Sequence, residues 1–303
     1  MTSRQALPLV GILVWAGVAL TAARPIPHEH AAIPPRTVAH GHGSIAENCN
    51  DLHIRFDDRD TVVQSEERTI QKAEAPLLRV RAPHNGGLQV QGWDQASYSV
   101  TLCKAVEEGS DAESLRSQIH LTFQNGELGV SGPPSGDRWS AHLLIRAPKA
   151  AAMDLQAHNG PLTLLRVDGN VKVRSENGPV TVTDCTGDLD LNSHNGPVTL
   201  EGNSGKLNIR TENGPVTVSL TGQKWSGTGL EAHATNGPVQ LEIPSGYESG
   251  VILESDGNGP FQCHASVCSE GRKTWDEEHK RIEFGSGPTL VRVSTVNGPV
   301  SVN

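Results

Sequence analysis

The tripeptide Asn-Gly-Pro recurs in the second half of the chain and constrains its fold more than any other feature. Its seven copies begin at Asn159, Asn177, Asn195, Asn213, Asn236, Asn258 and Asn297. The first three spacings are 18 residues each, and the next three are 23, 22 and 39. Regular self-similarity at a period of this size is typical of repeat architectures. Residues 150–303 are therefore predicted to form one repeated array, whose later units carry insertions.

Apolar and polar residues alternate on both sides of each turn, which is the period of a half-buried β-strand. Val180 and Val182 follow one turn, and Val171 and Val173 precede it. A second turn falls in the middle of each repeat, as at 186–188. Each unit is thus predicted to hold two short strands and two corners. Aromatic residues make up only 4% of the chain, so we expect a narrow core of Val, Leu, Ile and Ala.

The proline after each Asn-Gly favours parallel stacking over hairpins. In a two-residue hairpin the residue after Asn-Gly donates the backbone N–H that closes the turn. Pro179, Pro197 and Pro215 have no N–H to donate. We therefore predict an all-β fold, a parallel β-solenoid (β-helix) with rungs of about 18 residues spaced at about 4.8 Å. The turn asparagines would then form a ladder of hydrogen-bonded amides.

The region 48–149 is predicted to be β-rich but irregular. Its expected strands are 77–81, 88–91, 98–103, 119–123 and 142–146, and a capping box at 110–113 predicts a short helix ending near residue 118. The segment 84–90 is a degenerate copy of the later repeats.

The N-terminus sets the expected compartment. Residues 1–23 combine Arg4, an apolar run and small residues before Arg24, which is the layout of a secretory signal peptide cleaved after Ala22 or Ala23. The alternative is an uncleaved membrane anchor. Residues 24–47 are rich in His, Pro and Ala and are predicted to be a disordered linker. We expect an exported protein that is periplasmic, on the cell surface or secreted.

Charge limits the classes of partner. The formal net charge is −9, and it becomes −10 when residues 1–23, whose one charge is positive, are removed. An acidic chain without a basic block is a poor ligand for nucleic acid or anionic lipid. No nucleic-acid partner is therefore expected, and a membrane contact is expected only through an uncleaved signal segment.

Five cysteines in an exported chain allow two disulfides and one remaining thiol. Cys263 and Cys268 are close in sequence and are the first pair we propose. Cys49 and Cys103 would form the second pair. Cys185 occupies a repeat position held by Val167 one unit earlier, so we interpret it as a small buried hydrophobic residue rather than a reactive thiol.

The repeated phrase Ser/Thr-x-Asn-Gly-Pro-Val-Thr-Val/Leu at 175–182, 193–200 and 211–218, with a similar phrase at 294–302, resembles a bacterial repeat family of unknown function called putative adhesins. That family is similar to the head domains of auto-transporter adhesins. The resemblance covers residues 150–303 well and 77–149 loosely. It implies a β-solenoid and an exported or surface location, and it provides no catalytic or binding residues. This chain departs from the pattern in a charged excursion at 264–287.

One column of residues could carry chemistry. With parallel rungs, His158, Glu176, His194 and Glu212 would lie side by side on the outer face. Two carboxylates two rungs apart could serve an inverting glycoside hydrolase, or the histidines and glutamates could hold a metal. We prefer a solvated charge column, because this stretch offers almost no aromatic side chains to bind sugar.

We therefore expect no enzyme, metal or cofactor, but an envelope adhesin or interaction scaffold whose partner is an unidentified protein or glycan of the cell envelope. The alternative is a carbohydrate-active enzyme that uses Glu176 and Glu212.

Overall fold

The computed structural model describes residues 37–38, 45–54, 56, 61–134, 138–257, 259–276 and 279–303. The chain divides into two units, Met1–Ile33 and Pro34–Asn303, and the described residues all belong to the second. The predicted signal peptide and most of the predicted linker lie outside the described residues. In the described part of the chain, no helix is long and apolar enough to span a membrane.

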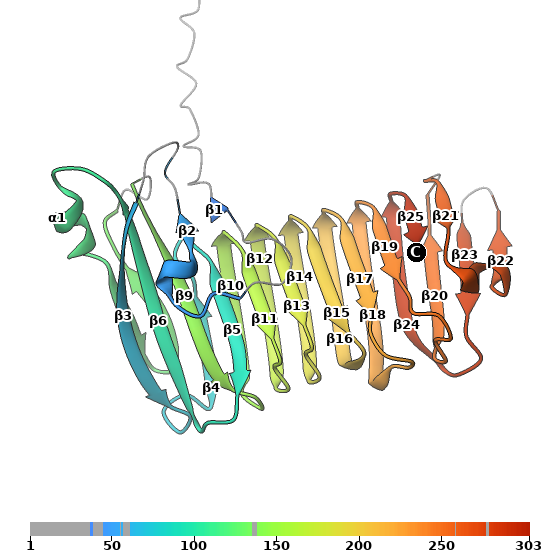
Figure 1. Cartoon of the computed structure of the whole chain (residues 1–303), viewed down its shortest axis with the longest axis horizontal. Helices are drawn as coiled ribbons and strands as arrows, with labels where there is room; N and C mark the ends of the chain where they lie inside the picture. Colours follow the sequence, from blue (N-terminus) through green and yellow to red (C-terminus); the bar gives the residue numbers. More distant parts are fainter. Residues whose placement is uncertain are drawn as a thin grey trace, which may run out of the picture. The chain divides into compact units, whose positions relative to one another are not determined.

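The protein is all-β, as the sequence predicts, and most of its strands belong to two large, mostly parallel sheets (Figure 1). The twelve-stranded sheet contains, in spatial order, β22 (Arg272–Trp275), β23 (Lys280–Phe284), β20 (Gly250–Ser255), β24 (Thr289–Asn297), β18 (Ser226–Asn236), β16 (Ser204–Asn213), β14 (Asp188–Asn195), β12 (Asn170–Asn177), β10 (Ala152–Asn159), β4 (Leu77–Arg81), β8 (Glu127–Ser131) and β7 (His120–Gln124).

The eleven-stranded sheet contains, in spatial order, β21 (Phe261–Cys263), β25 (Val300–Val302), β19 (Val239–Glu242), β17 (Val216–Leu220), β15 (Val198–Gly202), β13 (Val180–Thr183), β11 (Leu162–Leu165), β5 (Leu88–Trp93), β9 (Trp139–Pro148), β6 (Ser97–Glu107) and β3 (Thr61–Gln71). The remaining elements are β1 (Thr37–Val38), β2 (His53–Ile54), the helix α1 (Ala112–Arg116) and the 3₁₀ turns η1 (Cys49–Asp51) and η2 (Ser266–Ser269).

The repeats pair in parallel with a register of 18 residues. Asn177 lies opposite Asn195 in the twelve-stranded sheet, and Val180 lies opposite Val198 in the eleven-stranded sheet. The chain passes from one sheet to the other at each Asn-Gly-Pro corner that the structure describes, as expected for a turn that lacks the closing N–H. The repeats of residues 150–303 therefore stack in parallel, as predicted, whereas β22 and β23 of the charged excursion pair antiparallel.

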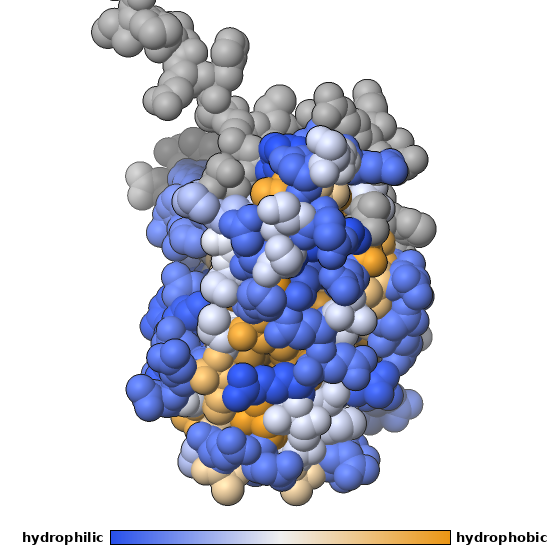
Figure 2. Space-filling view, turned by 90° about the vertical axis from the view of Figure 1, so that its left-hand side faces the viewer, coloured by the Kyte–Doolittle hydropathy of each residue, from blue (hydrophilic) through white to orange (hydrophobic). Residues whose placement is uncertain are grey.

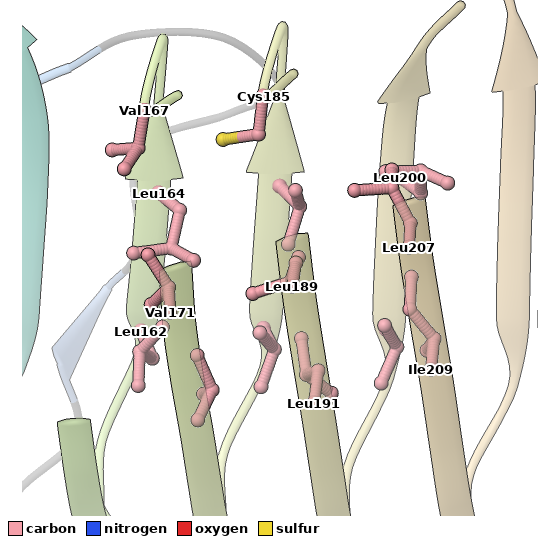
Figure 3. Packing of buried hydrophobic residues seen from close by; sticks show 14 of the residues in the cluster. Leu162, Leu164, Val167, Val171, Cys185, Leu189, Leu191, Leu200, Leu207 and Ile209 are labelled. Atoms are coloured by element: carbon pink, nitrogen blue, oxygen red, sulfur yellow. The ribbon is translucent and has the colours of Figure 1, made fainter. Parts of the chain in front are cut away.

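The core lies between the two sheets and consists of the inward-facing residues of each repeat. Val173 and Leu191 from one sheet, and Val182 and Leu200 from the other, are at most 1% exposed. Figure 3 shows these inward side chains in columns that run from repeat to repeat, with Cys185 next to Val167 in one of them.

The last repeat is inserted out of sequence order. β24 and β25 lie between the strands of the repeat at 226–242 and those of the repeat at 250–263 (Figure 1). The charged excursion explains how this is possible, because η2, β22 and β23 carry the chain beyond β20 and back again, with β23 antiparallel to β20.

The N-terminal region is more regular than the sequence suggested. β4 and β5 pair in parallel with β10 and β11 and so add one further repeat to the stack. β3, β6 and β9 form an antiparallel end to the eleven-stranded sheet. The predicted helix is present as α1, but its N-cap is Asp111 and no side chain caps it, so the predicted capping box is wrong.

The end of the stack at β3 and β7 is covered mainly by polar residues. Figure 2, which looks at this side, shows hydrophilic residues around a smaller apolar area. The residues partly buried against the core there are Leu115 of α1, Leu121 and Phe123 of β7, and Val130 of β8. Arg68 of β3 lies over the Phe123 ring, 5.0 Å from its centroid, and so links the ends of the two sheets.

Candidate functional site

The asparagines at the corners form one continuous chain of side-chain hydrogen bonds. The Nδ2 atom of each donates to the Oδ1 atom of the asparagine on the neighbouring strand, at 3.0 Å for Asn177 to Asn159, 2.9 Å for Asn195 to Asn177, 3.1 Å for Asn213 to Asn195, 3.1 Å for Asn236 to Asn213 and 3.0 Å for Asn297 to Asn236. Asn159 continues the chain to Asn85 at 3.3 Å. Asn258 lies outside the described residues. We call this set the asparagine ladder.

The backbone of each corner requires glycine. Gly178 has a φ of +148°, and a Cβ atom on it would lie 2.2 Å from the carbonyl oxygen of Gly160. Its N–H donates to the carbonyl of Asn195 at 3.0 Å. The ladder and the corner backbone are thus linked through Asn195. Its backbone carbonyl accepts the Gly178 N–H, and its side chain donates to the side chain of Asn177.

The proline of each corner leaves one glycine carbonyl without a backbone donor. On either side of this carbonyl the backbone is paired, since Gly178 N–H donates to Asn195 O and Val180 N–H donates to Pro197 O. The residue between these two donors is Pro179. Its nitrogen carries no hydrogen and cannot donate to Gly196 O. In the last repeat a side chain supplies the missing donor, because Thr295 Oγ1 donates to the equivalent Gly237 O at 2.9 Å.

Equivalent hydroxyl groups face inward in other repeats. Ser175, Ser193 and Thr211 are 2–4% exposed, and their oxygens have no hydrogen-bond partner among the described residues. In the sequence these residues stand out only as the first residue of the repeated phrase. Their burial could have been predicted from the alternation of inward and outward residues along each strand, because each stands two positions after an inward residue, namely Val173, Leu191 or Ile209.

The four column residues lie on the outer face of the twelve-stranded sheet, as predicted. The imidazole Nδ1 of His194 lies 2.7 Å from Oε2 of Glu212, and their side chains are 49% and 65% exposed. His158 contacts His84 edge to face, with ring centroids 5.1 Å apart. Glu176 of β12 lies next to His194 of β14, because the residues on either side of them are paired across the two strands, Ser175 with Ser193 and Asn177 with Asn195.

A shallow hollow lies over this column. It is lined by Arg174, Ser175, Glu176, Asn192, Ser193, His194 and Glu212. Its lining contains no Trp, Tyr or Phe, so it offers no aromatic platform for a sugar ring. Within the described residues, no group of three or more His, Cys, Asp or Glu side chains could hold a metal ion, so the metal interpretation finds no ligand set there.

Both predicted disulfides are present. Cys49 is joined to Cys103, and Cys263 is joined to Cys268. The first ties the segment 45–56 onto the outer face of the eleven-stranded sheet, where Gln89 also binds the backbone of Ala46 in both directions at 2.8 and 3.1 Å. Two disulfides are typical of proteins that mature in an oxidising compartment, and they point to export.

The remaining thiol is inert. Cys185 is buried in the core, and burial raises the pKa of its thiol to about 11. A thiol with a raised pKa carries little thiolate at neutral pH, and the thiolate is the reactive form. The structure therefore agrees with the prediction of a small hydrophobic residue.

A buried histidine escaped the sequence analysis. His142 on β9 is 4% exposed, and its Nδ1 accepts the N–H of Gly87 at 3.0 Å. Its Nε2 lies 3.3 Å from Ser140 Oγ, whose hydroxyl also reaches Asn85 O at 3.2 Å. Burial lowers the pKa of His142 to about 4, so the ring is neutral at physiological pH. Its contacts are all internal, so its role is structural.

The fold and the site define an exported-type, all-β repeat protein without an assembled catalytic group among its described residues. No protein-family model matches the chain, and no curated protein matches it. Solved structures do. One is named a putative cell adhesion protein from Clostridium sporogenes, with 11% identity, a TM-score of 0.36, and coverage of 80% of this chain and 99% of that one.

Two further structures come from Parabacteroides. A putative adhesin from Parabacteroides merdae has 12% identity and a TM-score of 0.34, and covers 80% of this chain and 96% of its own. A putative lipid binding protein from Parabacteroides distasonis has 11% identity and a TM-score of 0.27, with 80% and 97% covered. At these scores we base the functional proposal on the residues of this chain.

Proposed function

We propose that the protein is an exported, non-enzymatic β-solenoid that works as an adhesin or interaction scaffold of the cell envelope. The observation that carries this proposal is where the repetition lies. Three sets of residues recur from repeat to repeat, namely the asparagine ladder, the corner glycines and prolines and the buried core, and all three are structural. On the eleven-stranded sheet an outward threonine also recurs, at Thr163, Thr181, Thr199 and Thr217. On the twelve-stranded sheet the outward residues change from one repeat to the next, as in the series His158, Glu176, His194 and Glu212.

Such an arrangement suits binding by a rigid surface. The twelve-stranded sheet presents several outward columns of polar side chains, and neighbouring strands hold them at fixed separations of about 4.8 Å. Arg81 and Arg174 both pair with Asp154 on this face, at 3.3 and 3.4 Å. A partner that contacts many repeats at once gains from each additional contact, because every one after the first is effectively intramolecular. We expect this partner to be a protein or glycan of the envelope.

The alternative enzyme would use Glu176 and Glu212 as a carboxylate pair on the two sides of a glycosidic bond. The strand that carries His194 lies between them, and His194 is paired with Glu212. The hollow around them is open and polar. These features support a solvated charge column rather than a glycosidase centre.

Export is the first part of the proposal to test. The full chain is expressed in a bacterial host, the cell is fractionated, and the N-terminus of the product is determined. We expect an envelope or secreted product that starts after Ala22 or Ala23 and holds both disulfides. A reduced, full-length product that remains in the cytoplasm would contradict the proposal.

Binding by the outer face is the second part. The purified protein is sedimented with washed cell envelopes, beside a variant with Glu176→Lys and Glu212→Lys on the twelve-stranded sheet. Glu201→Lys with Glu242→Lys on the eleven-stranded sheet is the control, because both glutamates are exposed and the pair changes the net charge by the same amount. We expect the first pair to reduce co-sedimentation several-fold more than the control. Equal retention of all three proteins would contradict binding through this face.

A further inference from the structure

The dipeptide Asn-Gly occurs in this protein in two different settings. In the corners it belongs to the asparagine ladder. At Asn125-Gly126 it forms the two-residue turn between β7 and β8, where Gln124 pairs with Glu127 in an antiparallel hairpin. Both turn residues have positive φ, 51° for Asn125 and 75° for Gly126, as a type I′ turn requires.

The two settings leave the asparagine side chain in opposite states. Asn195 in the ladder donates to Asn177 at 2.9 Å and accepts from Asn213 at 3.1 Å, while the N–H of Gly196 donates to Asn213 O at 2.9 Å. Both groups of the Asn-Gly pair are therefore engaged. Asn125 is exposed, and its side chain has no hydrogen-bond partner in the described part of the chain.

We propose that Asn125 is a site of spontaneous deamidation and that the asparagine ladder protects the corner Asn-Gly pairs from the same reaction. The Gly126 nitrogen loses its proton to solvent base and attacks Cγ of Asn125, forming a C–N bond. The Cγ–Nδ2 bond breaks, and ammonia leaves with a proton from water. A water molecule then opens the cyclic imide at either carbonyl to give aspartate or isoaspartate, with no oxidation or reduction.

Deamidation should be slower at Asn195 than at Asn125 because more hydrogen bonds must break at Asn195 before the backbone nitrogen can attack. In either setting the side chain and the following peptide must rotate so that the nitrogen meets Cγ. At Asn195 this rotation breaks two side-chain hydrogen bonds and one backbone hydrogen bond, and the loss of all three slows the reaction. The turn at Asn125 belongs to β7 and β8, where β7 is the last strand of its sheet. Gly126 is buried, so its nitrogen meets solvent base only when this edge opens, and local opening at a sheet edge costs little free energy.

The product would change this end of the sheet. Gly126 O accepts the N–H of Arg79 at 2.9 Å, which links the turn to β4. Isoaspartate adds one atom to the backbone of a turn whose two residues fit the hairpin closely, and it adds a negative charge. We expect the modified turn to weaken the contact between β8 and β4 while the ladder stays intact.

The experiment compares folded and unfolded protein by peptide mapping. The full chain with both disulfides intact is incubated at mildly alkaline pH, and mass spectrometry follows the exchange of amide –NH₂ for –OH at each Asn-Gly pair. A parallel sample in concentrated urea measures the intrinsic rate at each site. In the folded protein we expect Asn125 to react at least about tenfold faster than Asn195, which corresponds to about 1.4 kcal/mol of protection. In urea the two rates should be within a few-fold.

A variant tests the cause of the protection. Asn177→Ala removes the acceptor of Asn195 and should raise the folded-state rate at Asn195 several-fold, while the rate at Asn125 stays unchanged. Equal rates at Asn125 and Asn195 in the folded protein would overturn the proposal. So would an Asn125 that reacts only in urea, or an Asn195 that is unaffected by Asn177→Ala.

Discussion

The Nδ2 atom of Asn195 donates a hydrogen bond of 2.9 Å to the Oδ1 atom of Asn177, which stands 18 residues earlier in the chain and on the neighbouring strand. Asn195 also accepts from Asn213, so each ladder asparagine connects two neighbours. This contact forms because the sequence repeats every 18 residues and neighbouring strands pair in parallel with the same register, which places the corner asparagines side by side.

The first prediction compares a ladder residue with a surface residue of the same repeat. Asn195→Ala leaves Asn177 and Asn213 each without one partner. These hydrogen bonds are exposed and water can replace them in part, so the free energy of unfolding should fall by about 0.5–1.5 kcal/mol. Thr199→Ala removes an outward, half-buried side chain and should cost less than about 0.5 kcal/mol, apart from a small loss of β-propensity. Urea denaturation of both variants measures the difference. Equal midpoint shifts would show that the ladder contributes nothing beyond an ordinary surface residue.

The second prediction concerns the inward hydroxyls. Thr295→Ala removes the donor to Gly237 O and should cost about 1–2 kcal/mol. Ser193→Ala removes a buried hydroxyl that has no partner among the described residues, so it should be neutral or slightly stabilising. Thermal or urea unfolding can compare the two. A larger loss for Ser193→Ala than for Thr295→Ala would mean that an internal water or another acceptor satisfies the serine.

The third prediction is a pH dependence that originates at His142. The pKa is about 4 in the folded protein and about 6.5 in an unfolded chain, so the unfolded state binds the extra proton between these values. The stability that this residue contributes is complete above pH 6.5 and is lost as the pH falls toward 4, by roughly 2–4 kcal/mol in total. His142→Gln should unfold with a shallower slope over this range. Parallel pH profiles for both proteins would contradict a buried, neutral His142.

The fourth prediction ranks the two disulfides. The Cys49–Cys103 bond closes a loop with a sequence separation of 54, and Cys263–Cys268 one of 5. Loop-closure entropy assigns about 4 kcal/mol to the longer loop and about 2 kcal/mol to the shorter one. Replacing both cysteines of a pair by alanine should therefore destabilise the protein more for the first pair. The opposite ranking would show that native contacts, rather than chain entropy, set the contribution of these bonds.

Much of the fold can be predicted from the repeat because residues close together in the sequence determine it. The 18-residue period fixes which residues face inward, and the missing N–H of proline excludes the hairpin that Asn-Gly alone would suggest. The same dipeptide without proline forms that hairpin at Asn125-Gly126. At Asn85-Gly86-Gly87, which also lacks proline, it forms a corner of the parallel stack, so proline favours the corner but is not required for it. The ladder follows from the parallel register. The disulfides follow from the number of cysteines in a chain that is predicted to be exported.

Other features depend on contacts that no local pattern encodes. The last repeat lies between the strands at 226–242 and those at 250–263 because β24, and not β20, pairs with β18. His142 is neutral because it is buried, and Gly87, which stands 55 residues earlier in the chain, provides its donor. At the outer face, the sequence predicted which residues form the column, but only the structure shows that His194 pairs with Glu212.

The central claim is that this outer face binds rather than catalyses, and a glycan-degradation screen tests it most directly. Wild type and the double variant Glu176→Gln/Glu212→Gln are incubated with envelope and plant polysaccharides, and released reducing ends are measured. We predict no hydrolysis by either protein and a change in stability of at most about 1 kcal/mol near pH 6, because exposed pairs such as His194–Glu212 contribute little. Hydrolysis by the wild type that disappears in the double variant would contradict the account and establish a glycosidase at this column.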